Sequence, residues 1–596
     1  MVLTVGMIQL LSSFGVRTND PAKEITGMLC RDVDAFSCYI RDSLQPAIRS
    51  GSGENLRPAF LSARKYYKQI EWAAEYFAYS TARFINGAPK AEAELPGNSN
   101  MILSPSGLQV MEEHIFPVFD TASRDQLLGQ TENILDKLQV FRSYFSGIPV
   151  AAWQILDAAK LEVFRIETLG ITGYDSPLGR NSMEECAVSL QALQLALAPY
   201  DTHNTLGELL NRNIAFLLAN RDFDRFNRAL YIRSYANPLT TAIERLRRQL
   251  DVQGYHYNRL LRQDVFTLFD RQAFNADAYS PFLDQENKPA KIALGKVLFT
   301  ETAFSGNGST SCASCHHPQT AFADNLAKHG DIRGTGFIDR NVPSLVNTAL
   351  QPQQFYDQRA ETLEEQVNDV VHNPKEMGGS IHAALQAITR SGRYEQLFAA
   401  AFPGNTQPDS AAVTEALAAY VRSLVQLNSR FDDYMAGNDT AMSDEAIRGF
   451  NLFMGKAGCG ACHYMPLFSG VLPPKFITQD AEVLGVPDKP GSKNIDPDRG
   501  LFNMLLGYNY FDSTRLSAEF DHAFKTVTVR NASKTAPYMH NGVFATLEEV
   551  MDFYNEGGGR GNGLPVANQS LSAEKLRLTP EETQDVIAFM RALDSR

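Results

Sequence analysis

Two copies of a five-residue motif constrain this chain more than any other feature of its sequence. Each copy has two cysteines separated by two residues and followed directly by a histidine: Cys312-Ala-Ser-Cys315-His316 and Cys459-Gly-Ala-Cys462-His463. Cysteines at this spacing can form thioethers with the two vinyl groups of one haem, and the adjacent imidazole can bind the iron. The two motifs, called the first and second pentad below, therefore predict two covalently attached haem c groups, with the four cysteines as attachment sites and the two histidines as iron ligands.

Chance does not explain the pair. In a chain of 596 residues with 7 cysteines and 11 histidines, one pentad arises with a probability of roughly one in 700, and two with about one in a million. The competing interpretations are a zinc site and a thioredoxin-like dithiol. Zinc-binding cysteine pairs usually lie closer together in sequence, and a dithiol does not need a following histidine twice.

The other three cysteines, Cys30, Cys38 and Cys186, lie far upstream of the pentads. They could include one disulfide, but three buried thiols are the simpler expectation. The first fifteen residues form a short apolar run without Lys or Arg before Arg17. This run is either the end of a clipped export signal or a buried first helix.

Composition and chemistry together restrict location and partners. The net charge of −13 disfavours nucleic acid, because there is no basic excess to bind phosphates. No stretch approaches the ~20 apolar residues of a membrane span. Haem is attached through thioethers on the outer side of the cytoplasmic membrane, so a periplasmic location is expected.

The sequence predicts a mainly α fold in three parts. Apolar residues recur three and four apart from about Pro21 to Asp277, which indicates a helical N-terminal domain. Proline-containing stretches between about Asn275 and Lys291 then interrupt this pattern. Beyond them, Leu294-Gly-Lys-Val-Leu-Phe299 precedes the first pentad and Arg448-Gly-Phe-Asn-Leu-Phe453 precedes the second. We therefore predict a helical domain (1–280) of unknown role and two related cytochrome c-like haem domains (281–440 and 441–596).

From about Ile292 to its C-terminus, the chain resembles the bacterial di-haem cytochrome c peroxidase and MauG family. The resemblance covers roughly half of the protein, and the helical part before it is not part of the family pattern. The matching stretches are Leu294-Gly-Lys-Val-Leu-Phe299, Ser311-Cys-Ala-Ser-Cys-His-His-Pro318, Arg340-Asn-Val-Pro-Ser-Leu345, Asn373-Pro-Lys-Glu-Met377 and Thr535-Ala-Pro-Tyr-Met-His-Asn-Gly542.

The resemblance implies that peroxide reacts at the first haem, beside Glu376 and Gln366. A carboxylate suits this position, because a proton must move from the inner to the outer peroxide oxygen before the O–O bond breaks. Between the haems, the family has a tryptophan where this chain has Tyr356, in Gln354-Phe-Tyr-Asp-Gln-Arg359. This is a departure: oxidation of a tyrosine releases a proton, so electron transfer would depend on a nearby base.

The resemblance also implies two further metal-binding features. A calcium ion between the haem domains would be held by the Asn341 side chain and the backbone carbonyls of Thr535 and Pro537, and oxygen ligands suit this hard cation. The sixth ligand of the second haem is a methionine in the peroxidase branch and a tyrosine in MauG. In both branches this ligand lies about fourteen residues after the histidine of a Pro-Tyr-x-His motif, which is His540 here. The resemblance therefore implies Tyr554 as the ligand, whereas Met539 and Met551 lie off this register.

These features predict a di-haem peroxidase that reduces hydrogen peroxide with electrons passed through the second haem. Two alternatives stay open: a MauG-like oxidase that uses peroxide to oxidise a protein side chain, and a non-enzymatic di-haem electron carrier. The partner is accordingly a small electron-donor protein or an oxidisable protein substrate.

Overall fold

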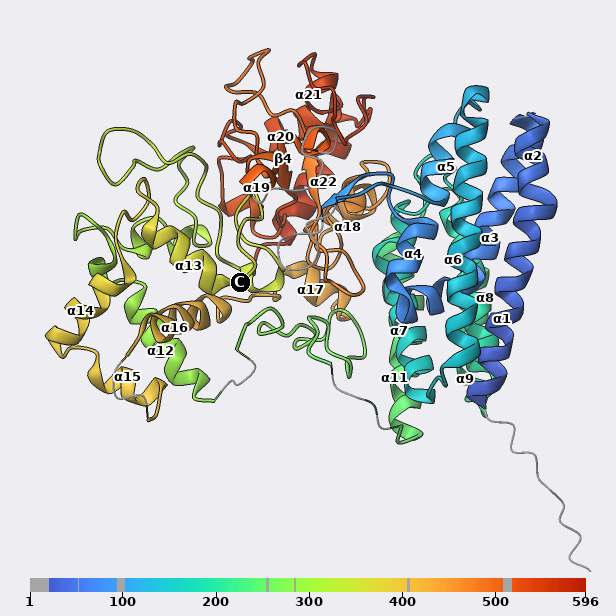
Figure 1. The fold of residues 1–596 in the computed structure, drawn as a ribbon, viewed down its shortest axis with the longest axis horizontal. Coiled ribbons are helices and arrows are strands. Elements are labelled where there is room, and N and C mark those ends of the chain that lie inside the picture. The colour runs from blue at the N-terminus through green and yellow to red at the C-terminus, as the bar shows by residue number, and fades with distance from the viewer. Residues whose placement is uncertain are drawn as a thin grey trace, which may run out of the picture.

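The computed structural model describes residues 21–596 except 52, 94–101, 253, 255–256, 283–285, 405–407 and 508–516. The apolar run at the start of the chain lies outside the described residues. In Figure 1 a bundle of helices lies at one end, the C-terminal part of the chain lies next to it, and α12–α16 form the opposite end. Below, residues 21–280 are called the helical segment, residues 281–440 the first pentad segment and residues 441–596 the second pentad segment.

The helical segment consists of long helices and one small antiparallel sheet. Its strands pair Glu92 with Leu103 and Ala93 with Ile102. The elements are α1 (Pro21–Tyr39), α2 (Gln45–Ser50), α3 (Gly53–Phe77), α4 (Tyr79–Asn86), β1 (Glu92–Ala93), β2 (Ile102–Leu103), α5 (Leu108–Ile115), α6 (Arg124–Gly147), α7 (Ala152–Thr168), α8 (Ser182–Leu197), α9 (Thr205–Ala219), α10 (Arg228–Tyr231) and α11 (Asn237–Gln249).

Helix α7 is buried along nearly its whole length, although it carries several charged residues. Some of these charges are paired with neighbouring elements: Arg165 binds Asp175 at 2.7 Å, and Lys160 binds Glu244 at 2.7 Å. Burial of a charged group is tolerated where an opposite charge compensates it. The core of the bundle therefore contains buried ion pairs among its apolar side chains.

The prediction of helix up to about Asp277 is wrong for its last part, because α11 ends at Gln249 and the next helix begins at Lys288. In the described residues between them, polar side chains bond local backbone instead. Asp270 accepts from the backbone N–H of Phe266 at 2.8 Å and from the hydroxyl of Thr267 at 2.9 Å. Such bonds stabilise turns in competition with helix, while Leu260 and Leu268 still supply buried apolar contacts.

The expectation of three buried thiols is also wrong. Cys186 is buried, but Cys30 is only half-buried and Cys38 is exposed. The reason is the orientation of α1, whose buried face carries Leu29, Val33 and Phe36 and so turns Cys38 toward solvent. All seven cysteines belong to the described residues, and all are free.

The two pentad segments are built from shorter helices and loops. The second one holds a two-stranded antiparallel sheet in which Ala481, Glu482 and Val483 pair with Lys525, Phe524 and Ala523. The elements are α12 (Lys288–Leu298), α13 (Leu363–His372), α14 (Ile381–Ser391), α15 (Glu395–Ala401), α16 (Ser410–Arg422), α17 (Arg430–Met435), α18 (Asp444–Phe453), β3 (Ala481–Val483), α19 (Leu501–Gly507), β4 (Ala523–Lys525), α20 (Leu547–Asn555), α21 (Gly558–Gly561) and α22 (Pro580–Ala592).

In each pentad segment the first helix packs closely against a later one, α12 against α16 and α18 against α22. Both contacts depend on the glycine of the repeated sequence. A Cβ atom at Gly295 would collide with the carbonyl oxygen of Ala416, and one at Gly449 with that of Asp585. The resemblance between the two segments therefore extends from sequence to helix packing.

We expect Gly449→Ala to lower the free energy of unfolding by about 1–3 kcal/mol, because the added methyl group must push α18 and α22 apart. Thermal unfolding followed by circular dichroism measures the effect. Gly129→Ala is the control: Gly129 lies in α6 with open space around it, so a stabilising or neutral effect is expected. A Gly449→Ala protein as stable as the wild type would contradict the close approach.

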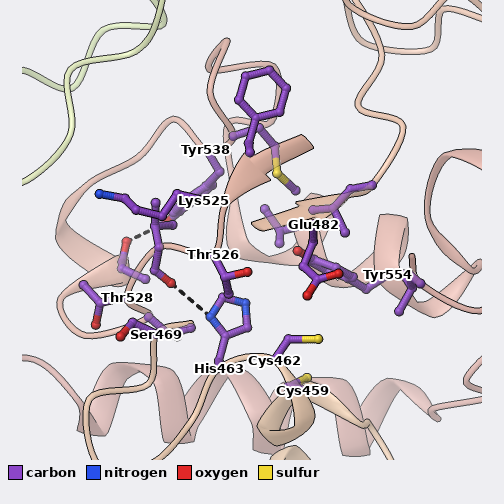
Figure 2. A pocket seen from close by; sticks show the side chains of 18 of the residues that line it. Cys459, Cys462, His463, Ser469, Glu482, Lys525, Thr526, Thr528, Tyr538 and Tyr554 are labelled. Carbon is purple, nitrogen blue, oxygen red and sulfur yellow. Dashed lines mark hydrogen bonds between the residues drawn. The ribbon is translucent and has the colours of Figure 1, made fainter. Parts of the chain in front are cut away.

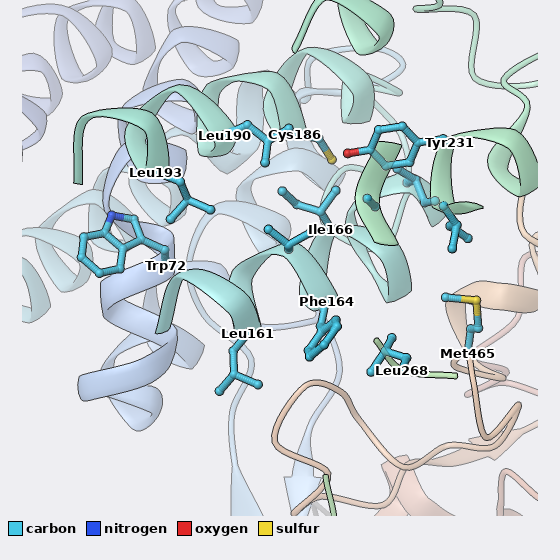
Figure 3. Packing of buried hydrophobic residues seen from close by; sticks show 14 of the residues in the cluster. Trp72, Leu161, Phe164, Ile166, Cys186, Leu190, Leu193, Tyr231, Leu268 and Met465 are labelled. Atoms are coloured by element: carbon cyan, nitrogen blue, oxygen red, sulfur yellow. The ribbon is translucent and has the colours of Figure 1, made fainter. Parts of the chain in front are cut away.

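The helical segment and the second pentad segment share one hydrophobic core. A continuous cluster of buried residues runs from α1 through α11 and on into α17, α18, α20 and α22, whereas most of the first pentad segment has a cluster of its own. Figure 3 shows Met465 of the second pentad segment on the side of this cluster near Leu268 and Phe164. The helical segment is thus packed against the surroundings of the second pentad.

Candidate functional site

The two pentads have the same local geometry. Each forms a single 3-10 turn, Cys312–Ser314 and Cys459–Ala461. The backbone N–H of His316 donates to the carbonyl of Cys312 at 3.0 Å, and that of His463 donates to Cys459 at 2.8 Å. In both, a phenylalanine ring from the preceding helix lies 6.4 Å from the imidazole, Phe299 beside His316 and Phe453 beside His463.

Both imidazoles are oriented by a hydrogen bond to backbone. The Nδ1 of His316 donates to the carbonyl of Phe322 at 2.7 Å, and the Nδ1 of His463 donates to that of Val527 at 3.0 Å (Figure 2). A proton on Nδ1 leaves the Nε2 lone pair available for a metal. Burial lowers the pKa of both histidines, which favours the neutral form that an iron ligand needs.

A cavity of about 660 Å³ lies beside the second pentad and is lined by Cys459, Cys462 and His463. Figure 2 shows these side chains together with Glu482 and Tyr554 around the same space. Its volume lies within the roughly 300–1,000 Å³ of cofactor and ligand pockets. Thiols for attachment, an oriented imidazole and a cavity of this size together fit a covalently bound haem.

Tyr554, the predicted sixth ligand of this haem, lines the cavity. The two methionines that lie off its register, Met551 and Met539, line it as well. Tyr554 comes from the last turn of α20. Burial raises the pKa of Tyr554, and the neighbouring Cys459 and Cys462 raise it further. The phenol thus lines the same cavity as the two cysteines of the second pentad.

Burial raises the pKa of Cys315 in the first pentad, and the nearby charges of Asp324 and Glu376 raise it further. Burial raises the pKa of Glu376 itself to about 7, and the cation of Arg359 opposes this shift. The side-chain N–H of Asn373 donates to Oε1 of Glu376 at 2.8 Å and orients the carboxylate. Gln366, from α13, and Tyr356 line the cavity beside the second pentad, whereas Glu376 and the residues of the first pentad are not among those that line it. A carboxyl group with a pKa near neutrality suits proton transfer.

Tyr356 lies where the two pentad segments meet. Its backbone carbonyl accepts from the N–H of Lys525 at 2.7 Å, and its hydroxyl donates to Oδ1 of Asn341 at 3.3 Å. Burial raises the pKa of Tyr356. An amide oxygen is a poor proton acceptor, so the base that oxidation of this tyrosine requires does not hydrogen-bond to it in the described part of the chain.

The three predicted calcium ligands line the same cavity. Asn341 is buried, and its backbone N–H donates to the carbonyl of His540 at 2.7 Å, which ties the two segments together. Among the described residues, no hydrogen bond reaches the carbonyl oxygens of Thr535 and Pro537. The buried amide oxygen of Asn341 and these two carbonyl oxygens match the oxygen ligands that calcium prefers.

Several residues of the cavity were not predicted from the sequence. The helical segment contributes part of its wall, through Thr172, Gly173, Ser176, Pro177, Leu178, Arg180 and Phe223. Lys90, also from the helical segment, forms an ion pair with Glu482 of the wall at 2.7 Å. Lys525 is buried, and burial lowers its pKa to about 7. The sequence could not predict that these two lysines lie at or beside the cavity, because their positions there arise only from contacts between segments.

Comparisons with known proteins show which proteins this chain resembles. A family model described as di-haem cytochrome c peroxidase matches residues 289–440. A cytochrome-c peroxidase of Pseudomonas sp. (strain SCT) is 32% identical over 363 residues, which cover 56% of this chain and 91% of that protein. The methylamine utilization protein MauG of Methylorubrum extorquens is 33% identical over 310 residues, or 51% of this chain and 78% of that protein. The crystal structure of a MauG-like protein associated with microbial copper homeostasis is 29% identical, with a TM-score of 0.45, and covers 52% of this chain and 90% of that one.

Proposed function

Because the chain belongs to the di-haem cytochrome c peroxidase family, we propose that it reduces hydrogen peroxide at the first pentad with electrons that arrive through the second. Membership of this family implies an oxidoreductase with two c-type haems. The haems supply iron that reacts with peroxide and exchanges electrons. The observation that carries the proposal is Glu376, an oriented carboxyl group near the first pentad with a pKa of about 7.

The role of Glu376 is to move one proton. Its carboxylate accepts the proton from one oxygen of hydrogen peroxide and returns it to the other, so that the O–O bond breaks with water as the leaving group. Asn373 holds the carboxylate in place, and Gln366 is proposed to bind peroxide beside it. Two electrons and two protons convert one hydrogen peroxide into two waters, so the site also needs an electron source.

We expect two haems per chain that remain with the polypeptide after extraction with acidified acetone. The pyridine haemochrome assay counts them, and a result of one haem or none would contradict the assignment of the pentads. Stopped-flow spectroscopy of the holoprotein mixed with hydrogen peroxide then tests the reaction itself. A rapid change in the haem spectrum is expected, whereas an electron carrier with two saturated irons would show none.

A second candidate function is oxidation of a protein side chain, as in the MauG branch. Tyr554 supports it, because this phenol comes from α20 into the cavity of the second pentad. A phenolate ligand stabilises oxidised iron and lowers its reduction potential, while a thioether ligand raises it. The partner is a small electron-donor protein in the first case and an oxidisable protein in the second.

We also propose one calcium ion, held by the Asn341 side chain and the carbonyls of Thr535 and Pro537. Purified protein is expected to contain one calcium ion per chain by plasma emission spectroscopy, and Asn341→Ala is expected to lose it. Asn368→Ala, at an exposed position in α13, is the control. Calcium that stays bound to Asn341→Ala would show that the ion lies elsewhere.

The proposed location is the periplasm, since thioether attachment of haem takes place outside the cytoplasmic membrane. None of the helices in the described part of the chain combines the length and apolar character needed to cross a bilayer.

A further inference from the structure

Tyr464 directly follows the iron-ligand candidate His463 and faces the helical segment. It is only 1% exposed. Its ring packs edge-on against the ring of Tyr174, with 5.7 Å between the centroids. Leu169 and Leu472 complete this small apolar cluster, in which each segment supplies one tyrosine and one leucine. The two phenols therefore connect the second pentad to the helical segment through direct ring contact.

The hydroxyl of Tyr464 has a built-in proton acceptor. It donates to Oδ2 of Asp480 at 2.6 Å, and Lys90 of the helical segment binds the same carboxylate at 2.9 Å. Burial alone would raise the pKa of Asp480, but Lys90 and the bond from Tyr464 hold this pKa below its usual value. The carboxyl group is therefore ionised and able to accept a proton. Among the described residues, the hydroxyl of Tyr356, between the two pentads, donates only to the amide oxygen of Asn341, at 3.3 Å.

We propose that Tyr464 and Tyr174 form an electron relay between the helical segment and the second haem, with Asp480 as the proton acceptor. The proposal rests on the proposed function, because the oxidant is the haem pair after its reaction with hydrogen peroxide. It assigns a role to the helical segment: electrons from a reduced one-electron donor protein enter through this segment.

Each step balances in electrons and protons. The oxidised haem pair takes one electron from Tyr464, whose phenol proton moves to Oδ2 of Asp480, leaving a neutral phenoxyl radical. Tyr174 then gives one electron to this radical, and Asp480 returns its proton to the oxygen of Tyr464. The freed carboxylate accepts the proton that Tyr174 loses; burial raises the pKa of Tyr174, and the charge of Asp480 raises it further. The donor protein supplies the electron that restores Tyr174, and the proton then goes back from Asp480.

Lys90 positions the carboxylate of Asp480. Lys90 bridges Asp480 at 2.9 Å and Glu482 at 2.7 Å, and Glu482 lines the haem cavity. This pair of contacts keeps the carboxylate of Asp480 directed at Tyr464 from the side of the helical segment. The helical segment thus supplies both the lysine that positions Asp480 and the tyrosine ring that contacts Tyr464.

The test is freeze-quench electron paramagnetic resonance of the full-length holoprotein mixed with hydrogen peroxide. Protein made with ring-deuterated tyrosine identifies a phenoxyl signal by its narrowing. The signal is expected in the wild type and lost in Tyr464→Phe. In Tyr174→Phe it is expected to persist longer than in the wild type, because the Tyr464 radical is no longer reduced from the helical segment. Tyr231→Phe is the control and should match the wild type, because Tyr231 is a fully buried tyrosine of the helical segment outside the proposed relay.

The outcomes separate this proposal from the proposed function. A wild-type protein whose haem spectrum does not change with peroxide would overturn both. If the haem spectrum changes but Tyr464→Phe keeps the phenoxyl signal, or Tyr174→Phe leaves its decay unchanged, the relay alone is wrong. Asp480→Asn keeps a hydrogen-bond acceptor without a base, so the phenoxyl signal should form more slowly. The opposite effects expected of the two tyrosine variants distinguish a relay from a general loss of folding, which would weaken the signal in both.

Discussion

Replacing Glu376 with glutamine is expected to slow the cleavage of hydrogen peroxide by roughly two or more orders of magnitude, the usual contribution of a positioned acid-base group. Glutamine keeps the size of the side chain and an oxygen that can accept from Asn373, but it cannot take up a proton. Both haems should remain bound. Stopped-flow spectroscopy measures the rate of the spectral change, and the pyridine haemochrome assay checks the haem content.

The pH dependence of the wild type gives a second readout of the same group. A proton acceptor must be ionised, so the rate is expected to rise with pH through about 7, the pKa of Glu376, and to level off above it. The Gln variant should lack this rise. Glu395→Gln, at an exposed position in α15 of the same segment, should retain both the rate and the rise. If Glu376→Gln reacts as fast as the wild type, Glu376 does not transfer the proton.

The second large effect is expected from Tyr554→Phe. With a phenolate on the second haem, the fully ferric protein should react with peroxide without prior reduction, and the variant should lose this reaction. The reduction potential of the second haem should rise by on the order of 0.1 V or more, within the ~0.8 V range that axial ligands span. Spectroelectrochemical titration measures the potential, and stopped-flow mixing of the ferric protein measures the reaction.

Met551→Leu is the matched control, since Met551 lies one turn earlier in α20 and lines the same cavity. It should leave the ferric reaction and the potential unchanged. A sulfur-to-iron charge-transfer band in the ferric spectrum that persists in Tyr554→Phe would identify a methionine ligand. The protein would then belong to the ordinary peroxidase branch and would need reduction before it reacts.

The chemistry of haem attachment could be predicted from the sequence because it depends on local spacing. Two cysteines and a histidine within five residues bring their side chains to one haem in almost any surrounding fold. The repeated Gly295 and Gly449 stretches likewise indicated two similar segments, and the observed helix contacts at these glycines agree. Helical periodicity was informative up to Gln249, where α11 ends. Beyond it, bonds such as those of Asp270 favoured turns.

The tertiary structure decided how the segments act on one another. Lys90, Tyr174 and Thr172 belong to the helical segment, yet they contact or line the surroundings of the second pentad, hundreds of residues away in the chain. The pKa of Glu376 is raised mainly by burial, and the proton acceptor of Tyr464 is a carboxylate sixteen residues further on. The covalent and ligand chemistry of the haems could be predicted from the amino-acid sequence, because it depends on a few adjacent residues. The charges and aromatic rings that meet around it could not, because burial and contact depend on which faces of distant helices and loops pack together.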